Sequence, residues 1–220
     1  MTDLDELVQR LLKLDTCAVS DALDKLGLTG IALGIVPTAP PAKIAGRVVT
    51  MKLVDRNAEN SATTTHLGTK AIEAANPGDV IVVQHGRTDA ACWGGILSAA
   101  AKTKGVAGVI CDGAARDIDE ARELEFPVFS KAATPMTARG RVVEESHQEP
   151  VLIGRIAVNP GDLVLADGSG VALIAASRAE EVIAAAEVIA AREALMKEAV
   201  LRGDNVVEVM GRDYEQMLAR

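Results

Sequence analysis

Two adjacent side chains of opposite charge, Arg116 and Asp117, are the residues of this sequence best suited to chemistry. They close the segment 111–117 (CDGAARD), which follows a predicted apolar strand and precedes a predicted helix. In α/β folds, ligands bind at the carboxyl ends of strands. A guanidinium can bind two oxygens of an anion with its fork, and a neighbouring carboxylate can hold a cation that binds the same anion. The spacing is also compatible with an aspartate at a helix N-terminus beside a surface arginine.

A pair of glycines, Gly94 and Gly95, lies upstream in the segment 91–98 (ACWGGILS), where another helix is predicted to begin. Backbone N–H groups at a helix start have no partner within the helix, and glycine lets an anion approach them closely. A substrate carboxylate could bind there, although any tight turn can also use such a pair. No lysine of the P-loop type follows, which disfavours a nucleoside triphosphate.

Histidines and cysteines give weaker signals. The three histidines lack the paired spacing of a His-rich zinc site, and nothing resembles a Ser-His-Asp arrangement. His85 alone follows a predicted strand near the predicted site, so a catalytic role for it stays open beside a structural one. The three cysteines are odd in number and include no C-x-x-C pair, which indicates reduced thiols in the cytosol.

Composition narrows the class of ligand. The 220 residues are 49% hydrophobic and 25% charged, which is ordinary for one globular domain. The formal charge of −8 opposes binding to the phosphate backbone of nucleic acids. Aromatic residues make up only 2% of the chain and leave few platforms for stacking bases. A small polar metabolite fits these limits.

The N-terminal segment argues against export. It is acidic and amphipathic where a signal peptide would be basic and then apolar, and no apolar run approaches about 18 residues. We therefore expect a cytoplasmic protein that does not interact with membranes.

The order of predicted elements is typical of an α/β fold with a mixed sheet. A long helix over about 177–202 mixes Ala with Glu and needs a partner surface, which predicts oligomerisation. The other predictions are helices over 4–12 and 19–26, a Gly- and Pro-rich connection over 28–43, a strand over 47–51, then helix 95–104, strand 106–111, helix 118–125, strand 128–130, and extended runs over 141–145, 151–158, 163–166 and 171–174.

Several short motifs, taken in order, resemble the RraA-like family. The likeness runs from about Thr16 to Glu193, and the ordered set is specific. The motifs are 78–82 (GDVIV), 93–97 (WGGIL), Gly105 with 108–110 (GVI), Asp112-Gly113 with Arg116-Asp117, 127–129 (PVF), 160–162 (PGD), and Asp167 with Gly170-Val171.

The resemblance implies a swivelling β/β/α sandwich with a mixed central sheet, assembled as a homotrimer or homohexamer with sites at subunit boundaries. We expect one domain over 1–220, with N-terminal helices in 1–27 and a C-terminal helical extension in 177–220. The family includes class II pyruvate aldolases that act on 4-hydroxy-4-methyl-2-oxoglutarate or 4-carboxy-4-hydroxy-2-oxoadipate and also decarboxylate oxaloacetate. It also includes a regulator that inhibits ribonuclease E.

In the family's aldolases, a glycine-containing loop and an arginine bind the substrate, and the aspartate after the arginine binds the metal. A single protein carboxylate suits Mg²⁺ or Mn²⁺, which complete their coordination with water and substrate oxygens. The resemblance assigns substrate binding to Gly94, Gly95, Ile96, Leu97 and Arg116, and metal binding to Asp117.

Two further positions follow from the resemblance. The aldolases often have an acidic residue after the first loop glycine, whereas this chain has Gly95 and so lacks a carboxylate that would orient water on the metal. They also use a catalytic Glu from the C-terminal helix of a neighbouring subunit. Glu193 matches that residue best, and Glu198 is the second choice.

These observations favour a metal-dependent lyase that cleaves a small 2-oxo acid through a pyruvate enolate, which the metal and Arg116 would stabilise. Aldol cleavage and oxaloacetate decarboxylation share that intermediate. Aldol cleavage needs a base for the 4-hydroxyl proton and decarboxylation does not, so decarboxylation demands less of a site with Gly95. The alternatives are a non-catalytic protein-binding regulator and an enzyme acting on an unrelated hydroxy- or oxo-acid.

Overall fold

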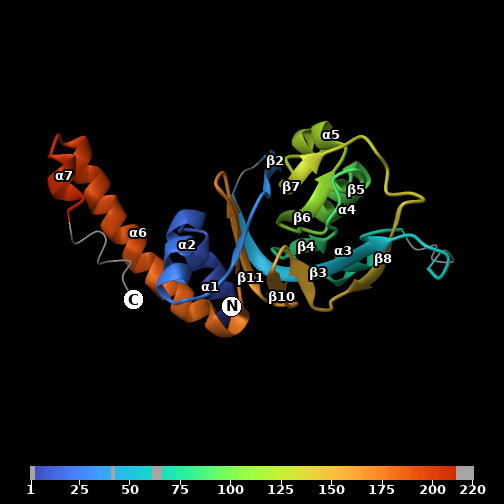
Figure 1. Cartoon of the computed structure of the whole chain (residues 1–220), viewed down its shortest axis with the longest axis horizontal. Coiled ribbons are helices and arrows are strands. Elements are labelled where there is room, and N and C mark those ends of the chain that lie inside the picture. The colour runs from blue at the N-terminus through green and yellow to red at the C-terminus, as the bar shows by residue number, and fades with distance from the viewer. Residues whose placement is uncertain (1–2, 41–42, 61–65, 212–220) are drawn as a thin grey trace.

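A ten-stranded mixed sheet forms the centre of the fold (Figure 1). The computed structural model describes residues 3–40, 43–60 and 66–211. The strand order is β1-β12-β11-β3-β4-β6-β7-β2, with β5 paired to β6 and β8 paired to β3, and β9 and β10 form a separate hairpin. The strands are β1 (Ile31–Ala32), β2 (Val36–Ala39), β3 (Ile44–Asp55), β4 (Val80–Gln84), β5 (Ala91–Trp93), β6 (Gly108–Ala115), β7 (Val128–Ala133), β8 (Val142–His147), β9 (Val151–Ile153), β10 (Ile156–Val158), β11 (Leu163–Asp167) and β12 (Gly170–Ile174).

Helices occur before the first strand, between the strands β3 and β7, and after the last strand of the described residues. In the described ranges, no helix combines the length and the apolar character needed to cross a membrane. The helices are α1 (Asp3–Leu11), α2 (Thr16–Lys25), α3 (Thr69–Ala74), α4 (Gly95–Thr103), α5 (Ile118–Glu123), the 3₁₀ turn Ala176–Arg178, α6 (Ala179–Leu201) and α7 (Val206–Val209).

The long strand β3 joins the two parts of the sheet. Its first residues pair antiparallel with β11, its middle pairs parallel with β4, and its last residues pair antiparallel with β8. Parallel pairing continues from β4 to β6 and from β6 to β7. The sheet is therefore mixed, as the sequence predicted. Its parallel strands read as continuous apolar runs because both of their faces are buried.

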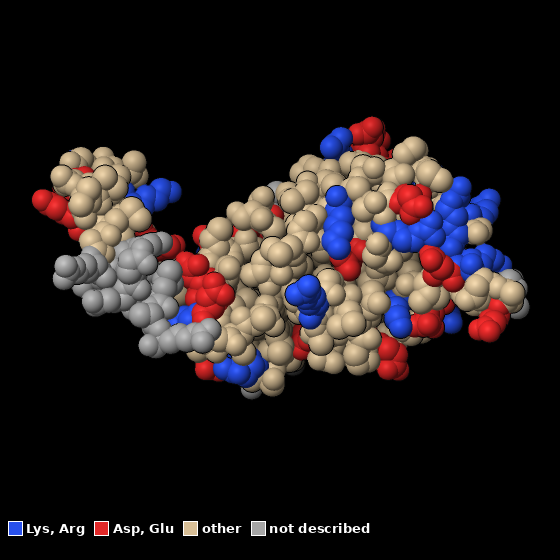
Figure 2. Space-filling view, viewed as in Figure 1, with Lys and Arg blue, Asp and Glu red and all other residues tan. Residues whose placement is uncertain are grey.

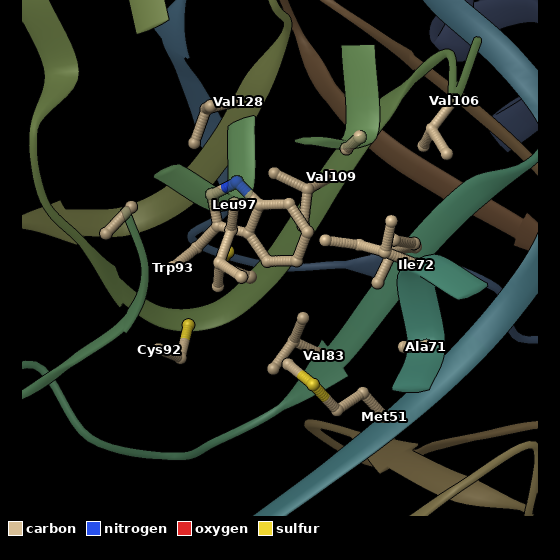
Figure 3. Packing of buried hydrophobic residues seen from close by; sticks show 14 of the residues in the cluster. Met51, Ala71, Ile72, Val83, Cys92, Trp93, Leu97, Val106, Val109 and Val128 are labelled. Carbon is tan, nitrogen blue, oxygen red and sulfur yellow. The ribbon is translucent and has the colours of Figure 1, made fainter. Parts of the chain in front are cut away.

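Helices α3, α4 and α5 connect these strands and pack on one face of the parallel unit. Their apolar residues join a cluster with side chains of β3, β4, β6 and β7, and Figure 3 shows Trp93, Leu97 and Ile72 within it. The Trp93 and Phe126 rings stack with their centroids 6.4 Å apart. The largest side chains of this core thus lie beside the start of α4.

Helices α1, α2 and the first half of α6 cover the antiparallel part of the sheet. Val182, Ile183 and Ile189 of α6 are buried in a cluster with residues of α1, α2, β11 and β12. Arg10 of α1 forms ion pairs with Glu180 and Glu187 of α6 at 2.8 Å. The second half of α6 extends away from this body and carries α7 at its end (Figure 1).

Several predicted boundaries were wrong, and two of them change the sheet. The segment 28–43, expected as a connection, contains β1 and β2, which pair with β12 and β7. These short strands form the two edges of the sheet. Their pairing is a tertiary effect that local composition does not show. The segment 112–115, expected in a turn after the strand 106–111, continues β6 to Ala115, because β5 and β7 both pair with that end of the strand. The prediction of a single domain over 1–220 stays a prediction, and 212–220 lies outside the described residues.

Candidate functional site

Two parallel strands bring the predicted site residues together. Strand β5 pairs with the end of β6, with Trp93 opposite Ala115. The next residues of the two strands, Gly94 after β5 and Arg116 after β6, therefore emerge at the same edge of the sheet. The backbone N–H of Arg116 donates to the carbonyl of Trp93 at 2.9 Å and fixes the two segments relative to each other.

Asp117 occupies a strained backbone position between β6 and α5. Its φ of 56° and ψ of 41° are left-handed, a region that Asp adopts more readily than most residues but at a cost of roughly 1–3 kcal/mol. Although Asp117 is the N-cap residue of α5, its side chain makes no capping hydrogen bond. The carboxylate is directed instead at the glycine loop and at Arg116.

The Asp117 carboxylate is held by three donor contacts. Its Oδ2 accepts a hydrogen bond from the backbone N–H of Gly95 at 3.1 Å. Arg116 Nε lies 3.1 Å from both carboxylate oxygens. In the part of the chain that the structure describes, the terminal guanidinium nitrogens of Arg116 have no hydrogen-bond partner, so they remain available to an anion.

Position 94 requires glycine because the side chains of Asp117 and Arg116 approach it closely. Its backbone conformation does not require glycine, since it is extended at φ −154°. A Cβ at Gly94 would lie 2.8 Å from Asp117 Oδ2 and 3.2 Å from Arg116 Cγ. Any larger side chain would displace the arginine and the carboxylate together.

Sequence reasoning missed Glu120. A Cβ at Gly95 would lie 1.7 Å from Glu120 Oε2, so the carboxylate beside this loop comes from the first turn of α5 and not from position 95. Glu120 is exposed and lies outside the cavity lining. The only hint in the sequence is its position three residues after Asp117, one helical turn along.

A cavity of about 510 Å³ opens beside these residues. That volume falls in the range of small-molecule sites, roughly 300–1,000 Å³. All six residues predicted to bind substrate or metal line this cavity. One of them, Ile96, has 81% of its surface exposed to solvent. The rest of the lining comes from β5, residues 137–140, the start of β8, Leu67, Arg56 and His66. Sequence reasoning did not assign Arg56, His66 or Arg139 to a site.

The cavity is electropositive although the whole chain carries a formal charge of −8. Three arginines, Arg56, Arg116 and Arg139, line it with one carboxylate, that of Asp117. Figure 2 shows Lys and Arg side chains gathered on the side of the molecule where Figure 1 places β8. This local excess of positive charge attracts anions despite the overall charge.

The floor of the cavity is fixed by the core. The Trp93 indole Nε1 donates to Ser98 Oγ at 3.0 Å, and Ser98 N donates to the Gly94 carbonyl at 3.0 Å. Trp93 is buried among Val109, Cys92 and Leu97 (Figure 3). The glycine loop is therefore anchored to buried residues of the core.

Glu193 does not reach this cavity within one chain. It lies on α6, at the other end of the molecule from α4 and α5 (Figure 1), and lines a second, apolar cavity of about 330 Å³ with residues of α7. Burial, reinforced by the carboxylates of Asp21 and Asp15, raises the pKa of Glu193. Glu198 is exposed on the same helix. Their proposed roles in a neighbouring subunit's site stay predictions.

His85 is also away from the cavity lining. It is 8% exposed, its Nε2 lies 2.7 Å from the Ala90 carbonyl, and its Nδ1 has no partner in the described residues. Burial lowers its pKa. Neutral His85 therefore supports the turn before β5, and the structure does not bring it to the reacting groups.

The donor set at Asp117 suits a hard cation that keeps most of its water. Among the described residues, no group of three or more His, Cys, Asp or Glu side chains could hold a metal. Mg²⁺ typically uses one or two carboxylates and completes its octahedron with waters and substrate oxygens. The half-exposed, firmly positioned carboxylate of Asp117 fits that requirement.

Comparison with known proteins supports the same family. A family model described as RraA-like (Aldolase/RraA) matches residues 16–173. Protein DlpA of Legionella pneumophila is 31% identical over 96% of this chain, which spans only 34% of DlpA. A 4-hydroxy-4-methyl-2-oxoglutarate aldolase of Thermus thermophilus is 34% identical over 60% of this chain and 76% of its own length. The structure of RraAS2 from Streptomyces coelicolor, described as an unusual member of the RNase ES inhibitor RraA protein family, superposes with a TM-score of 0.79 at 26% identity, covering 90% of this chain and 98% of that one.

Proposed function

Because this chain belongs to the RraA-like family, we propose that it is a divalent-metal-dependent lyase that cleaves a small 2-oxo acid. The observation that supports this most directly is the convergence of the Arg116 guanidinium and the Asp117 carboxylate beside the start of α4, in one electropositive cavity. A relative named as an aldolase supports the choice of carbon–carbon cleavage.

Substrate binding would use backbone and side-chain donors together. The N–H groups of Ile96 and Leu97 lie in the first turn of α4, where the helix provides no carbonyl partner. These groups suit the substrate carboxylate. The terminal nitrogens of Arg116 suit the keto oxygen. Mg²⁺ or Mn²⁺ held by Asp117 would add positive charge toward the same oxygens.

The reaction follows from where charge develops. Breaking the bond between C3 and C4 leaves its electron pair on the pyruvate fragment, where it delocalises onto the keto oxygen as an enolate. Arg116 stabilises that oxygen more strongly as it becomes negative, which lowers the barrier. A proton then adds at C3 to give pyruvate. The second product is CO₂ from oxaloacetate or a carbonyl compound from a 4-hydroxy-2-oxo acid.

Aldol cleavage additionally requires a base for the 4-hydroxyl proton. We assign an acid–base role to Glu193 of a neighbouring subunit in a homotrimer or homohexamer, since α6 carries it away from its own cavity. Burial raises the pKa of Glu193, which favours a role in proton exchange. The proposed substrates are 4-hydroxy-4-methyl-2-oxoglutarate, oxaloacetate or both.

The test is a coupled assay of pyruvate release over a panel of 2-oxo acids, with and without Mg²⁺. We expect Mg²⁺-dependent release from oxaloacetate or from a 4-hydroxy-2-oxo diacid, and loss of release with a chelator. Release from no member of the panel, at micromolar enzyme and millimolar substrate, would contradict the proposal.

A second candidate function is a protein-binding regulator, which the structural likeness to RraAS2 favours. In that case the surface and not the cavity would carry the function. The two candidates separate in one comparison, because substitutions in the cavity should abolish lyase activity but leave binding to a ribonuclease unchanged.

A further inference from the structure

The cavity is larger and more positively charged than binding of a pyruvate unit requires. Arg116, Asp117 and the first turn of α4 account for one carboxylate, one keto oxygen and one cation. Arg139 and Arg56 line the same cavity and do not belong to that set. They are contributed by the loop before β8 and by the residue that follows β3.

Arg139 differs from the arginines that are already paired with carboxylates in the described residues. Arg10, Arg47, Arg87, Arg122, Arg178 and Arg202 all lie in ion pairs with carboxylates. In the described residues, no ion pair is formed by Arg139, although the chain has more acidic than basic residues. A guanidinium that lines a cavity and has no carboxylate partner of its own is positioned to bind a carboxylate of a ligand.

The loop that carries Arg139 is attached to the site. The Met136 carbonyl accepts from the N–H of Ala91 in β5 at 3.0 Å, and Arg139 N donates to Thr137 Oγ1 at 3.2 Å. The Arg141 guanidinium donates to the Thr137 carbonyl at 3.1 Å. Arg139 is therefore presented from a loop anchored to the strand that precedes the glycine loop.

Building on the proposed function, we infer that Arg139, assisted by Arg56, binds a second carboxylate on the fragment that leaves with C4. The substrate class is then a 2-oxo diacid, and Arg139 determines specificity against 2-oxo monoacids. The positive charges of Arg139 and Arg56 complement the second carboxylate of the substrate.

The test is calorimetric binding of pyruvate and of 2-oxoglutarate, in the presence of Mg²⁺, to the wild type and to two variants. Arg139→Gln removes the proposed contact. Arg155→Gln is the matched control, because it removes the same charge from an exposed residue of the β9–β10 turn outside the cavity lining. Melting temperatures confirm that both variants fold.

We expect the wild type to bind 2-oxoglutarate more tightly than pyruvate. Arg139→Gln should weaken 2-oxoglutarate binding about tenfold or more, by loss of a charged contact, and leave pyruvate binding unchanged. Arg155→Gln should change neither. Equal weakening of both ligands, no weakening, an effect matched by Arg155→Gln, or no preference of the wild type for the diacid would overturn the inference.

This experiment separates the subsite from the proposed function. Diacid binding that depends on Arg139, with no pyruvate released from any 2-oxo diacid, would establish the subsite and contradict the lyase. Pyruvate release that is unaffected by Arg139→Gln, with unchanged binding, would support the lyase and contradict the subsite.

Discussion

The guanidinium of Arg116 makes one contact within the protein and offers another to a ligand. Its Nε contacts both oxygens of Asp117, and its terminal nitrogens are available toward the cavity. The first contact fixes the direction of the fork, so the second is oriented before a ligand arrives. Such preorganised donors are most effective where charge appears only in the transition state.

Arg116→Lys should therefore lower kcat more than it changes KM. Lysine keeps the charge but offers a point donor in place of a planar fork, so alignment with the keto oxygen is lost. The penalty should be on the order of a hundredfold in kcat, roughly 3 kcal/mol. Steady-state kinetics measure both parameters. A rise in KM alone would show that Arg116 only anchors the substrate.

At the residue scale, the sequence predicted six residues of the cavity lining, about a third of it. The residues at 94–97 and at 116–117 follow strands, and the carboxyl ends of parallel strands meet at one edge. Arg56, His66 and Arg139 lie in connections with no periodic pattern, and only the tertiary fold brings them to the cavity. Glu120 is adjacent to Gly95 through the packing of α4 against α5, which local sequence does not encode.

The elements that position the site are the parallel strands and the helices α3, α4 and α5, which pack on one face of them. Strand β5 is only three residues long, yet its pairing with β6 sets the spacing between the glycine loop and Arg116. Most of these elements were predictable from apolar runs and turn residues. Strand β5 and helix α3 were not predicted. The strands β1 and β2 were not predicted either, because their pairing with distant strands stabilises them more than their local sequence does.

The turn before β5 gives the fold a pH dependence. Burial lowers the pKa of His85, so the unfolded chain takes up a proton at a higher pH than the folded chain does. The contribution of neutral His85 to stability is complete above the ordinary histidine pKa of about 6.5 and is lost as the pH falls through the folded-state value.

His85→Gln should therefore flatten the fall in melting temperature between pH 7 and pH 5. Glutamine can still donate to the Ala90 carbonyl, and it does not titrate. Thermal unfolding followed by circular dichroism at several pH values measures the slope. Parallel curves for the variant and the wild type would mean that other groups cause the acid sensitivity.

The shape of the whole molecule indicates assembly. Half of α6 packs on its own chain, while its second half and α7 leave the body with exposed apolar side chains. Leu195 is 67% exposed and Leu201 77% exposed, a degree of exposure that a partner surface would relieve.

We expect a homotrimer or homohexamer in solution by light scattering at micromolar concentration. A chain ending at Arg192 keeps the buried residues of α6 through Ile189, so it should fold. It should assemble more weakly, and it should lose turnover because Glu193 is missing. The melting temperature checks the fold of the truncated chain. A monomeric wild type, or a truncated chain with full assembly and turnover, would contradict a role of the second half of α6 and α7 in assembly.

A comparison of pyruvate release by Asp117→Asn and by Asp119→Asn tests most directly whether the protein is a metal-dependent lyase with its metal at Asp117. Both changes remove one carboxylate charge within two residues, but Asp119 is 90% exposed and pairs only with Arg122 among the described residues. Asparagine also tolerates the left-handed backbone at position 117, so the fold and its melting temperature should barely change. We predict near-complete loss of Mg²⁺-dependent turnover in Asp117→Asn and near wild-type turnover in Asp119→Asn. Full turnover in Asp117→Asn, or turnover that a chelator does not reduce, would contradict a metal-dependent lyase at this site.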